Sequence, residues 1–136
     1  MMGSVQISAK ADYAVRALLV LAADPDQGPI TGRAVATSQG MPVKFVENTL
    51  VQLRTSGLVR AQRGAGGGFR LGRPADEISI ADVIRAVDGP LADVRGEPPE
   101  ELEYVAPVEA LQTVWIAVRA NIRNVLERVT LADVVG

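Results

Sequence analysis

The sequence contains no cysteine and no histidine among its 136 residues. These absences exclude disulfides, thiolate nucleophiles, imidazole bases, zinc sites of Cys and His, and iron–sulfur clusters held by cysteine. They assign no redox compartment, because a cytosolic protein needs no disulfide and a secreted protein can lack them. We expect that the protein holds no cofactor and no metal. We also expect that it is not an enzyme, since the sequence shows no nucleophile paired with a base.

Aromatic residues and uninterrupted apolar runs are also scarce. Aromatics make up 4% of the chain, which offers no stacking platform for single-stranded nucleic acid. The apolar stretch near the N-terminus is broken by Lys10, Asp12 and Arg16, so it matches neither a signal peptide nor a membrane span. The rest of the composition, 48% hydrophobic and 22% charged, is typical of a globular domain. We expect a cytoplasmic protein without a membrane segment.

The charges are segregated along the chain, although the formal net charge is only −2. Residues 28–75 hold seven basic residues and one acidic residue, a local net charge of +6. Residues 76–109 hold ten acidic and two basic residues, a local net charge of −8. Such polarisation favours one basic face that attracts polyanions, and the alternative is a scatter of solvated charges.

Helical periodicity and capping residues predict three helices in the first half of the chain. Apolar residues recur at helical spacing over residues 8–23, where the first residue is a potential N-cap. Thr31 can cap a second, short helix that ends at Gly40. Pro42 suits the first turn of a third, amphipathic helix that Gly57 closes. Two short helices joined by a tight glycine-containing turn predict a helix-turn-helix.

The next segment changes to a period of two. Residues 58–62 and 69–71 can alternate faces as short strands, and residues 63–68 between them are rich in glycine. A hairpin that directly follows a helix-turn-helix is a wing, which we place at about residues 58–73.

The glycine-rich loop also resembles a nucleotide-binding loop. It lacks the lysine of a P-loop, and a strand rather than a helix follows it. An ordinary hairpin turn is a second alternative. As the tip of a wing, the loop would let the backbone at Gly66 and Gly67 approach a sugar-phosphate chain while Arg63 reaches a narrow minor groove.

Polar residues occupy the outer side of the third predicted helix. Lys44, Glu47 and Asn48 lie at its start, and Arg54 lies farther along. Lysine donates to guanine or phosphate, glutamate accepts from cytosine, and asparagine pairs with adenine. A solvated helix face is the alternative, but the preceding capped helix and the following wing favour a recognition helix for duplex DNA.

The second half of the chain begins with a helix that Ser79 can cap, and continues with an acidic, proline-containing loop at residues 91–106. Because no calcium-loop spacing is present, we interpret its carboxylates as a solvated loop rather than a catalytic or metal site. A long helix past Pro107 carries a heptad seam, and a short capped turn ends the chain. The seam comprises Leu111, Trp115, Val118, Ile122, Val125 and Val129.

A seam on so long a helix predicts a two-fold dimer, unless the helix packs only on its own domain. The expected architecture is mainly α with a small β-hairpin. It combines a winged helix-turn-helix domain (residues 1–90), the acidic loop (91–106), and a dimerisation helix with a C-terminal turn (107–136).

Four segments give the chain a resemblance to the Rrf-type bacterial winged-helix transcriptional regulators of the IscR and CymR kind. They read KADYAVRAL, FVENTLVQLRTSGLV, RGAGGGFRL and ISIADVIRAVDGPL, and the resemblance covers nearly the whole chain. It implies a dimeric DNA-binding regulator whose long helix dimerises. It also implies base reading by Lys44, Glu47 and Asn48, and minor-groove entry by Arg63.

The resemblance further implies contacts with the DNA backbone at Lys10, Thr31 and Gln39. In one respect the chain departs from the family. Many members hold an iron–sulfur cluster through three cysteines in the loop before the long helix, and this loop has none. Cluster sensing is therefore not expected here, and any regulation would come from an unidentified small molecule or partner protein.

Together these features predict a homodimeric transcriptional regulator, a repressor that occupies a palindromic promoter site. The rival hypothesis is a winged-helix protein-interaction module that acts through its acidic loop or long helix. The basic residues of the wing favour the first hypothesis, and a steep loss of DNA affinity with rising salt separates the two.

We expect Arg63→Ala to weaken binding most on sites that are A/T-rich where the wing lies, because arginine is attracted to a narrow minor groove. We expect Glu47→Ala mainly to relax sequence preference. Binding titrations with specific and random duplexes check both outcomes. Equal losses of affinity on the two duplexes for Glu47→Ala would contradict a base-reading role.

Overall fold

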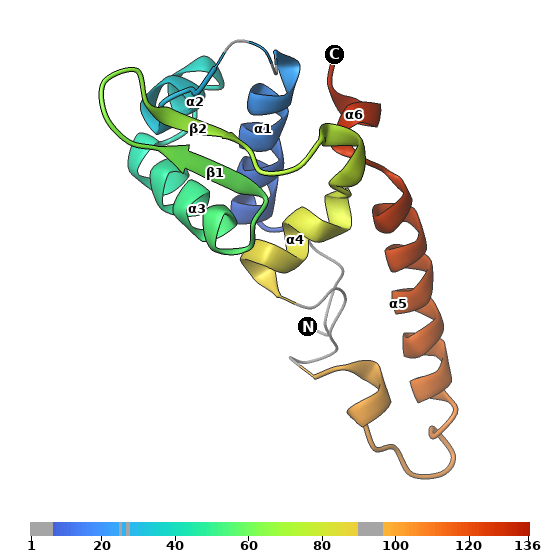
Figure 1. Ribbon diagram of the computed structural model, residues 1–136. Helices are drawn as coiled ribbons and strands as arrows, with labels where there is room; N and C mark the ends of the chain where they lie inside the picture. The colour runs from blue at the N-terminus through green and yellow to red at the C-terminus, as the bar shows by residue number, and fades with distance from the viewer. Residues whose placement is uncertain (1–6, 25, 27, 90–96) are drawn as a thin grey trace.

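The computed structural model describes residues 7–24, 26, 28–89 and 97–136. Part of the expected acidic loop, residues 91–96, lies outside the described residues. Figure 1 shows a cluster of helices crossed by a β-hairpin, with one long helix standing along its side and projecting beyond it. This arrangement confirms the expected mainly α architecture with a small hairpin. Within the described residues, no helix is long and apolar enough to cross a membrane.

The three N-terminal helices form where local sequence predicts them. They are α1 (Ala9–Ala23), α2 (Gly32–Ser38) and α3 (Val43–Thr55). The Ser8 hydroxyl accepts a hydrogen bond from the amide of Ala11 at 2.9 Å, and the Thr31 hydroxyl accepts one from Ala34 at 3.1 Å. Each cap satisfies an amide that the first helical turn leaves without a backbone partner.

The core is built around one face of α3. Val46, Leu50 and Leu53 recur at helical spacing and have no exposed surface. They join one buried cluster with residues of α1 and α2, including Leu18 and Val35. Burial of side chains of this size stabilises the fold by roughly 1.5–3 kcal/mol each. The opposite face of α3 is therefore held toward solvent.

The wing consists of β1 (Val59–Gln62) and β2 (Gly68–Leu71), paired in antiparallel register. A third segment pairs with β2, and this pairing is not predicted from the sequence. The Ile30 amide donates to the Phe69 carbonyl at 2.9 Å, and the Phe69 amide donates to the Ile30 carbonyl at 2.7 Å. Because Thr31 follows as the cap of α2, this bridge ties the base of the wing to the start of that helix.

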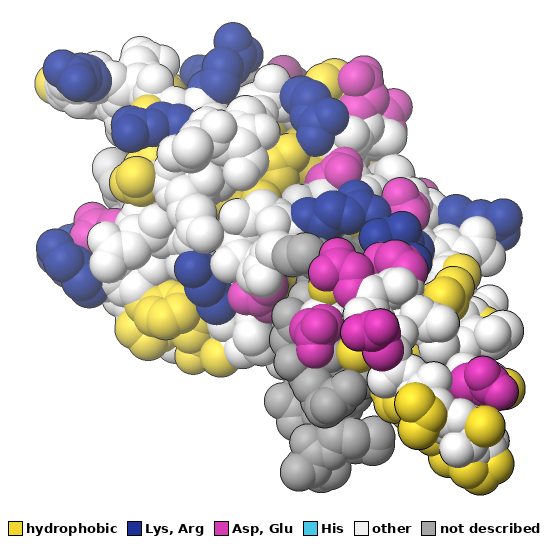
Figure 2. Space-filling view, turned by 90° about the horizontal axis from the view of Figure 1, so that it is seen from below, with side chains coloured by type: hydrophobic (Ala, Val, Ile, Leu, Met, Phe, Trp, Pro, Cys, Tyr) yellow, Lys and Arg dark blue, Asp and Glu magenta, His cyan; other side chains and the backbone are white. Residues whose placement is uncertain are grey.

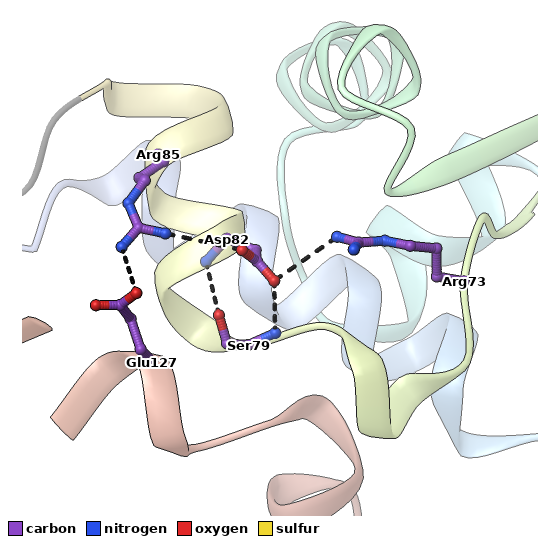
Figure 3. A network of polar contacts seen from close by, with 5 residues as sticks. All are labelled: Arg73, Ser79, Asp82, Arg85 and Glu127. Carbon is purple, nitrogen blue, oxygen red and sulfur yellow. Dashed lines mark hydrogen bonds and ion pairs between the residues drawn. The ribbon is translucent and has the colours of Figure 1, made fainter. Parts of the chain in front are cut away.

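The chain then passes through a 3-10 turn (Ala75–Glu77) into α4 (Ile80–Asp88). Ser79 and Asp82 form a capping box, in which each side chain bonds the other residue's amide at 3.0 Å. Figure 3 shows that Asp82 is also approached by Arg73, which follows the wing, and by Arg85. Arg85 in turn pairs with Glu127 of the long helix at 3.1 Å.

The long helix, α5 (Leu111–Arg128), is shorter than the predicted seam requires. It starts at Leu111 rather than just past Pro107, and Val129 lies beyond its end with an extended backbone. The Val129 carbonyl accepts a hydrogen bond from the Ile80 amide at 2.9 Å, which draws this segment onto the start of α4. The expectation that Val129 continues the helical seam is therefore wrong.

The chain ends in a short helix, α6 (Leu131–Val134), as expected, with a capping box formed by Thr130 and Asp133. Leu131 is fully buried and belongs to the same core cluster as α1 and α3. Figure 1 accordingly shows α6 beside α1, at the end of α5 that lies against the helical cluster. The C-terminal end of the long helix is thus held against the helical cluster.

We expect Gly68→Ala to lower the free energy of unfolding by about 2 kcal/mol or more. Gly68 has a φ of 149°, and a Cβ there would lie 2.5 Å from the carbonyl carbon of Ile30. Gly66→Ala is the control, because its φ of 76° is also unfavourable but a Cβ would meet nothing within 4 Å. Chemical denaturation should show the larger loss for Gly68→Ala, and equal losses would contradict a close approach to Ile30.

Candidate nucleic-acid interface

The outer face of α3 carries the predicted reading residues. Lys44 and Asn48 are exposed and lie one helical turn apart, opposite the buried face. Val51 continues the same stripe and is 44% exposed. A lysine ammonium and an asparagine amide supply donors for base edges, whereas valine suits the methyl group of thymine. The surface can therefore make both polar and apolar contacts in a major groove.

Glu47 lies on the flank of α3 that faces α2, and it is half-buried. A Cβ placed on Gly32 would lie 2.9 Å from the Glu47 Cγ and 3.6 Å from a Leu50 methyl carbon. The absence of a side chain at Gly32 thus gives the stem of Glu47 its space. Arg54 is exposed at the C-terminal end of the helix, away from the predicted reading residues.

The tip of the wing presents Arg63 and Gly66 to solvent. Gly67 is required there for a different reason, because a Cβ would lie 2.2 Å from the Gln62 carbonyl oxygen. The hairpin can close only if that residue has no side chain. The tip is therefore narrow, and its one charged side chain is a guanidinium suited to a phosphate-lined groove.

Three further predicted contacts lie at helix ends. Thr31 is exposed, and its oxygen already caps α2, so its hydroxyl proton is the group that can still bond a phosphate. Gln39 is exposed at the end of α2, and its carbonyl accepts a hydrogen bond from Arg16 at 2.7 Å. Lys10 is half-buried on the first turn of α1.

The start of α3 also carries an aromatic contact that the sequence analysis missed. Phe45 is 39% exposed, and its ring meets that of Tyr13 edge-on at 5.4 Å between centroids. The guanidinium of Arg16 lies 5.6 Å from the centre of the Tyr13 ring. The sequence does carry a signal for this contact, because Phe45 and Val51 are apolar although they lie off the buried stripe of α3. This contact joins α1 to the first turn of α3, where Phe45 lies between Lys44 and Glu47.

The space-filling view relates these residues to the charge segregation. Figure 2 shows Lys and Arg side chains around the winged-helix body, and Asp and Glu side chains gathered where the projecting arm joins it. Hydrophobic side chains collect over the far end of the arm. In this view Lys and Arg predominate over the winged-helix body, and Asp and Glu predominate where the arm joins it.

The arm consists of α5 and the segment before it, which contains a 3-10 turn (Pro99–Glu101). Val114, Val118 and Val125 form an exposed stripe, with exposed fractions of 50%, 37% and 60%. Two of them belong to the predicted seam. Trp115 is instead half-buried and donates from its indole nitrogen to the Tyr104 hydroxyl at 3.1 Å.

Leu111 and Ile122, which complete the predicted seam on α5, are half-buried. Every residue of α5 is described, and none of them is fully buried. The apolar surface of this helix is therefore only partly covered by its own chain.

Polar contacts hold the preceding segment onto α5. The Gln112 side-chain amide donates to the carbonyls of Pro99, Glu100 and Leu102 at 3.2, 3.1 and 2.8 Å. Arg119 pairs with the Glu100 carboxylate, with one bond of 2.6 Å. The hydrogen bond from Arg119 is the main reason that the pKa of Glu100 lies below its usual value. This loop is thus ordered by side chains of α5.

We expect Gly32→Ala to relax sequence preference while changing the free energy of unfolding by less than about 1 kcal/mol. The new methyl group displaces Glu47, whereas the gain in helix propensity offsets the crowding. The double variant Gly32→Ala/Glu47→Ala lacks the Glu47 Cγ that the new methyl group would crowd. Gly32→Ala should therefore cause no further loss of sequence preference beyond that of Glu47→Ala alone. Titrations with specific and random duplexes measure the cycle, and additive losses would contradict the coupling.

Comparisons with known proteins agree with this arrangement. Residues 7–136 match the family model described as "Rrf2: Iron-dependent Transcriptional regulator". The Mycobacterium tuberculosis protein Rv1287, an HTH-type regulator by name, is 49% identical over 97% of this chain and 82% of its own length. The HTH-type transcriptional regulator CymR of Bacillus subtilis is 33% identical over 95% of this chain and 88% of its own.

Solved structures agree as well. The structure of CymR, the global cysteine regulator of B. subtilis, superposes with a TM-score of 0.81 at 29% identity, covering 97% of both chains. T. potens IscR superposes with a TM-score of 0.76 at 33% identity, covering 94% of this chain and 84% of its own. These similarities confirm the expected winged-helix fold.

The iron in the family description does not fit the residues of this chain. Cysteine and histidine are absent from the sequence. Across the described ranges, no group of three or more Asp and Glu side chains is placed to hold a metal ion. The Glu100 carboxylate before α5 is already paired with Arg119. With iron set aside, the matched family model and the relatives establish that this chain belongs to the Rrf2 family and is a DNA-binding transcriptional regulator, not an enzyme.

Proposed function

We propose that this regulator is a homodimeric repressor that binds a palindromic promoter site in the cytoplasm. The observation that carries the proposal is the pairing of two surfaces. One is the polar outer face of α3, beside a wing tipped by Arg63, and the other is the exposed valine stripe of α5. The first suits duplex DNA, and the second suits a second copy of the chain.

In the proposed complex, α3 enters the major groove with its N-terminal turn leading. Lys44 donates to guanine or phosphate, Asn48 pairs with adenine, and Val51 contacts a thymine methyl group. Glu47 accepts from cytosine, and its half-buried stem limits the positions that its carboxylate can take. These roles divide sequence reading between the exposed stripe and the flank that faces α2.

The wing and the helix ends position the protein on the DNA backbone. We assign Arg63 to the minor groove, with Gly66 and Gly67 allowing the tip to approach the sugar-phosphate chain. Further contacts with phosphates come from Arg54, Lys10, Thr31 and Gln39. Such contacts fix register and supply affinity, whereas base contacts supply specificity.

The dimer follows from the arm. The valine stripe comprises Val114, Val118 and Val125, and we infer that Leu111 and Ile122 line its edge. We leave Trp115 outside the centre of the contact, because its indole is bonded to Tyr104 of its own chain. A two-fold axis across this stripe would present two copies of α3 to successive turns of a palindromic site.

Repression follows from occupancy, because a bound dimer denies a promoter to the transcription machinery. In this protein the loop before α5 is held by Gln112 and Arg119 rather than by a cluster. We therefore propose that the arm is ordered without a metal. Any signal that releases the promoter would come from a small molecule or a partner protein.

We expect Val125→Glu to convert the dimer to a monomer, since the two-fold contact would bury a carboxylate without a partner. Affinity for a palindromic site, identified by selection of genomic fragments, should fall by about 100-fold as the two half-sites lose their linkage. Light scattering and binding titrations measure the two effects.

The matched control is Ala120→Glu, an exposed residue of the same helix that points away from the valine stripe. This variant should remain dimeric and keep its affinity for the palindromic site. A Val125→Glu protein that is still dimeric would place the interface elsewhere.

A further inference from the structure

A cavity of about 460 Å³ lies behind the wing, between the end of α1 and the segment that leads from β2 to α4. The apolar residues in its lining include Leu21, Phe69 and Leu71. The basic residues in its lining are Arg60, Arg70 and Arg73. The volume lies within the range of pockets that hold small molecules, roughly 300–1,000 Å³.

Two of these arginines stand directly opposite each other. Arg60 of β1 and Arg70 of β2 are partners in the antiparallel register, so their side chains leave the hairpin on the same face. Like charges in such a pair destabilise a sheet. Arg70 also reaches across to the loop before α2, because a Cβ built on Gly28 would lie 3.9 Å from its Nη2 atom.

No carboxylate in the described ranges neutralises this pair. Arg73 is bound to Asp82 at 3.6 Å, whereas neither Arg60 nor Arg70 takes part in an ion pair among the described residues. Asp24 is the one acidic residue in the lining, against Arg60, Arg70 and the Asp82-bound Arg73. The cavity is thus an apolar recess with an excess of positive charge at its wall.

We propose that this cavity binds a small organic anion, with its carboxylate or phosphate group held by Arg60 and Arg70 and its apolar body in the apolar part of the cavity. The planar guanidinium fork matches both kinds of anionic group. An anion placed there relieves the repulsion between the two arginines. The apolar lining increases the affinity for a ligand that carries an apolar body as well as the anionic group. The site is separate from the outer face of α3.

The wing supplies both strands of this site, and α1 supplies another wall. A bound anion therefore links the hairpin to the helical body at a place where the Ile30 bridge already joins them. The anion would bind the free protein. A titration without DNA therefore separates failure of this site from failure of the proposed operator binding.

The test titrates the full chain in a calorimeter with phenyl phosphate, inorganic phosphate and phenol. Phenyl phosphate carries both the anionic group and an apolar body, whereas the other two probes carry one each. We expect phenyl phosphate to saturate one site per chain, about tenfold or more tighter than inorganic phosphate, and phenol to show no saturable binding. Equal affinities for phenyl phosphate and inorganic phosphate would overturn the proposal, because the apolar lining would then contribute nothing to binding.

Arg60→Gln/Arg70→Gln should weaken phenyl phosphate binding by about tenfold or more. The matched control, Arg33→Gln/Arg128→Gln, removes the same charge from exposed positions outside the cavity and should leave the affinity within about twofold. Arg60→Gln alone, at an exposed position, keeps the test valid if the double variant fails to fold. Equal weakening by both double variants would mean that net charge alone attracts the probe.

Discussion

The burial of one face of α3 is the constraint on which the rest of the structure depends. Val46, Leu50 and Leu53 are fully enclosed, so the rotation of this helix about its axis is fixed. Rotation toward solvent would expose apolar surface at roughly 25 cal/mol for each Å². Because the buried face is fixed, Lys44 and Asn48 have only one direction in which to point. Packing in the core thus sets the orientation of the surface proposed to read DNA.

Polar contacts connect the wing and the long helix to the helices that form the core. The Ile30 bridge joins the wing to the start of α2, and Asp82 lies between Arg73 after the wing and Arg85 on α4. Arg85 then reaches Glu127 on the long helix. Exposed ion pairs of this kind contribute only about 0–1 kcal/mol each, so they orient elements more than they stabilise them. The wing and the arm are nevertheless connected through a single helix.

The arm shows how a chain without cysteine orders the segment before its long helix. One glutamine side chain donates to three carbonyl groups of that segment, and an arginine is paired with one of its glutamates. These contacts require no metal and lie on the side of α5 away from its exposed valines. The same helix therefore fixes its own loop on one side and leaves an apolar stripe available on another.

The sequence by itself determined the first four helices, their caps and the hairpin, because these features depend on residues within a few positions of one another. Ser8, Thr31 and Ser79 were each predicted as caps, and each accepts the expected hydrogen bond. Alternation of polar and apolar residues also placed Lys44 and Asn48 on the outer face of α3. Such local patterns need no knowledge of what the helix packs against.

Only the tertiary structure decided the features that join distant segments. Three features depend on how elements pack: the bridge from Ile30 to Phe69, the space that Gly32 gives to Glu47, and the cavity behind the wing. Packing also explains why the predicted seam is not continuous. Trp115 is hydrogen-bonded to Tyr104 of its own chain, and Val129 lies beyond the helix, where its carbonyl accepts a hydrogen bond from Ile80. A heptad pattern indicates that apolar residues share one side of a helix. It does not indicate whether that side packs against its own chain or against a second chain.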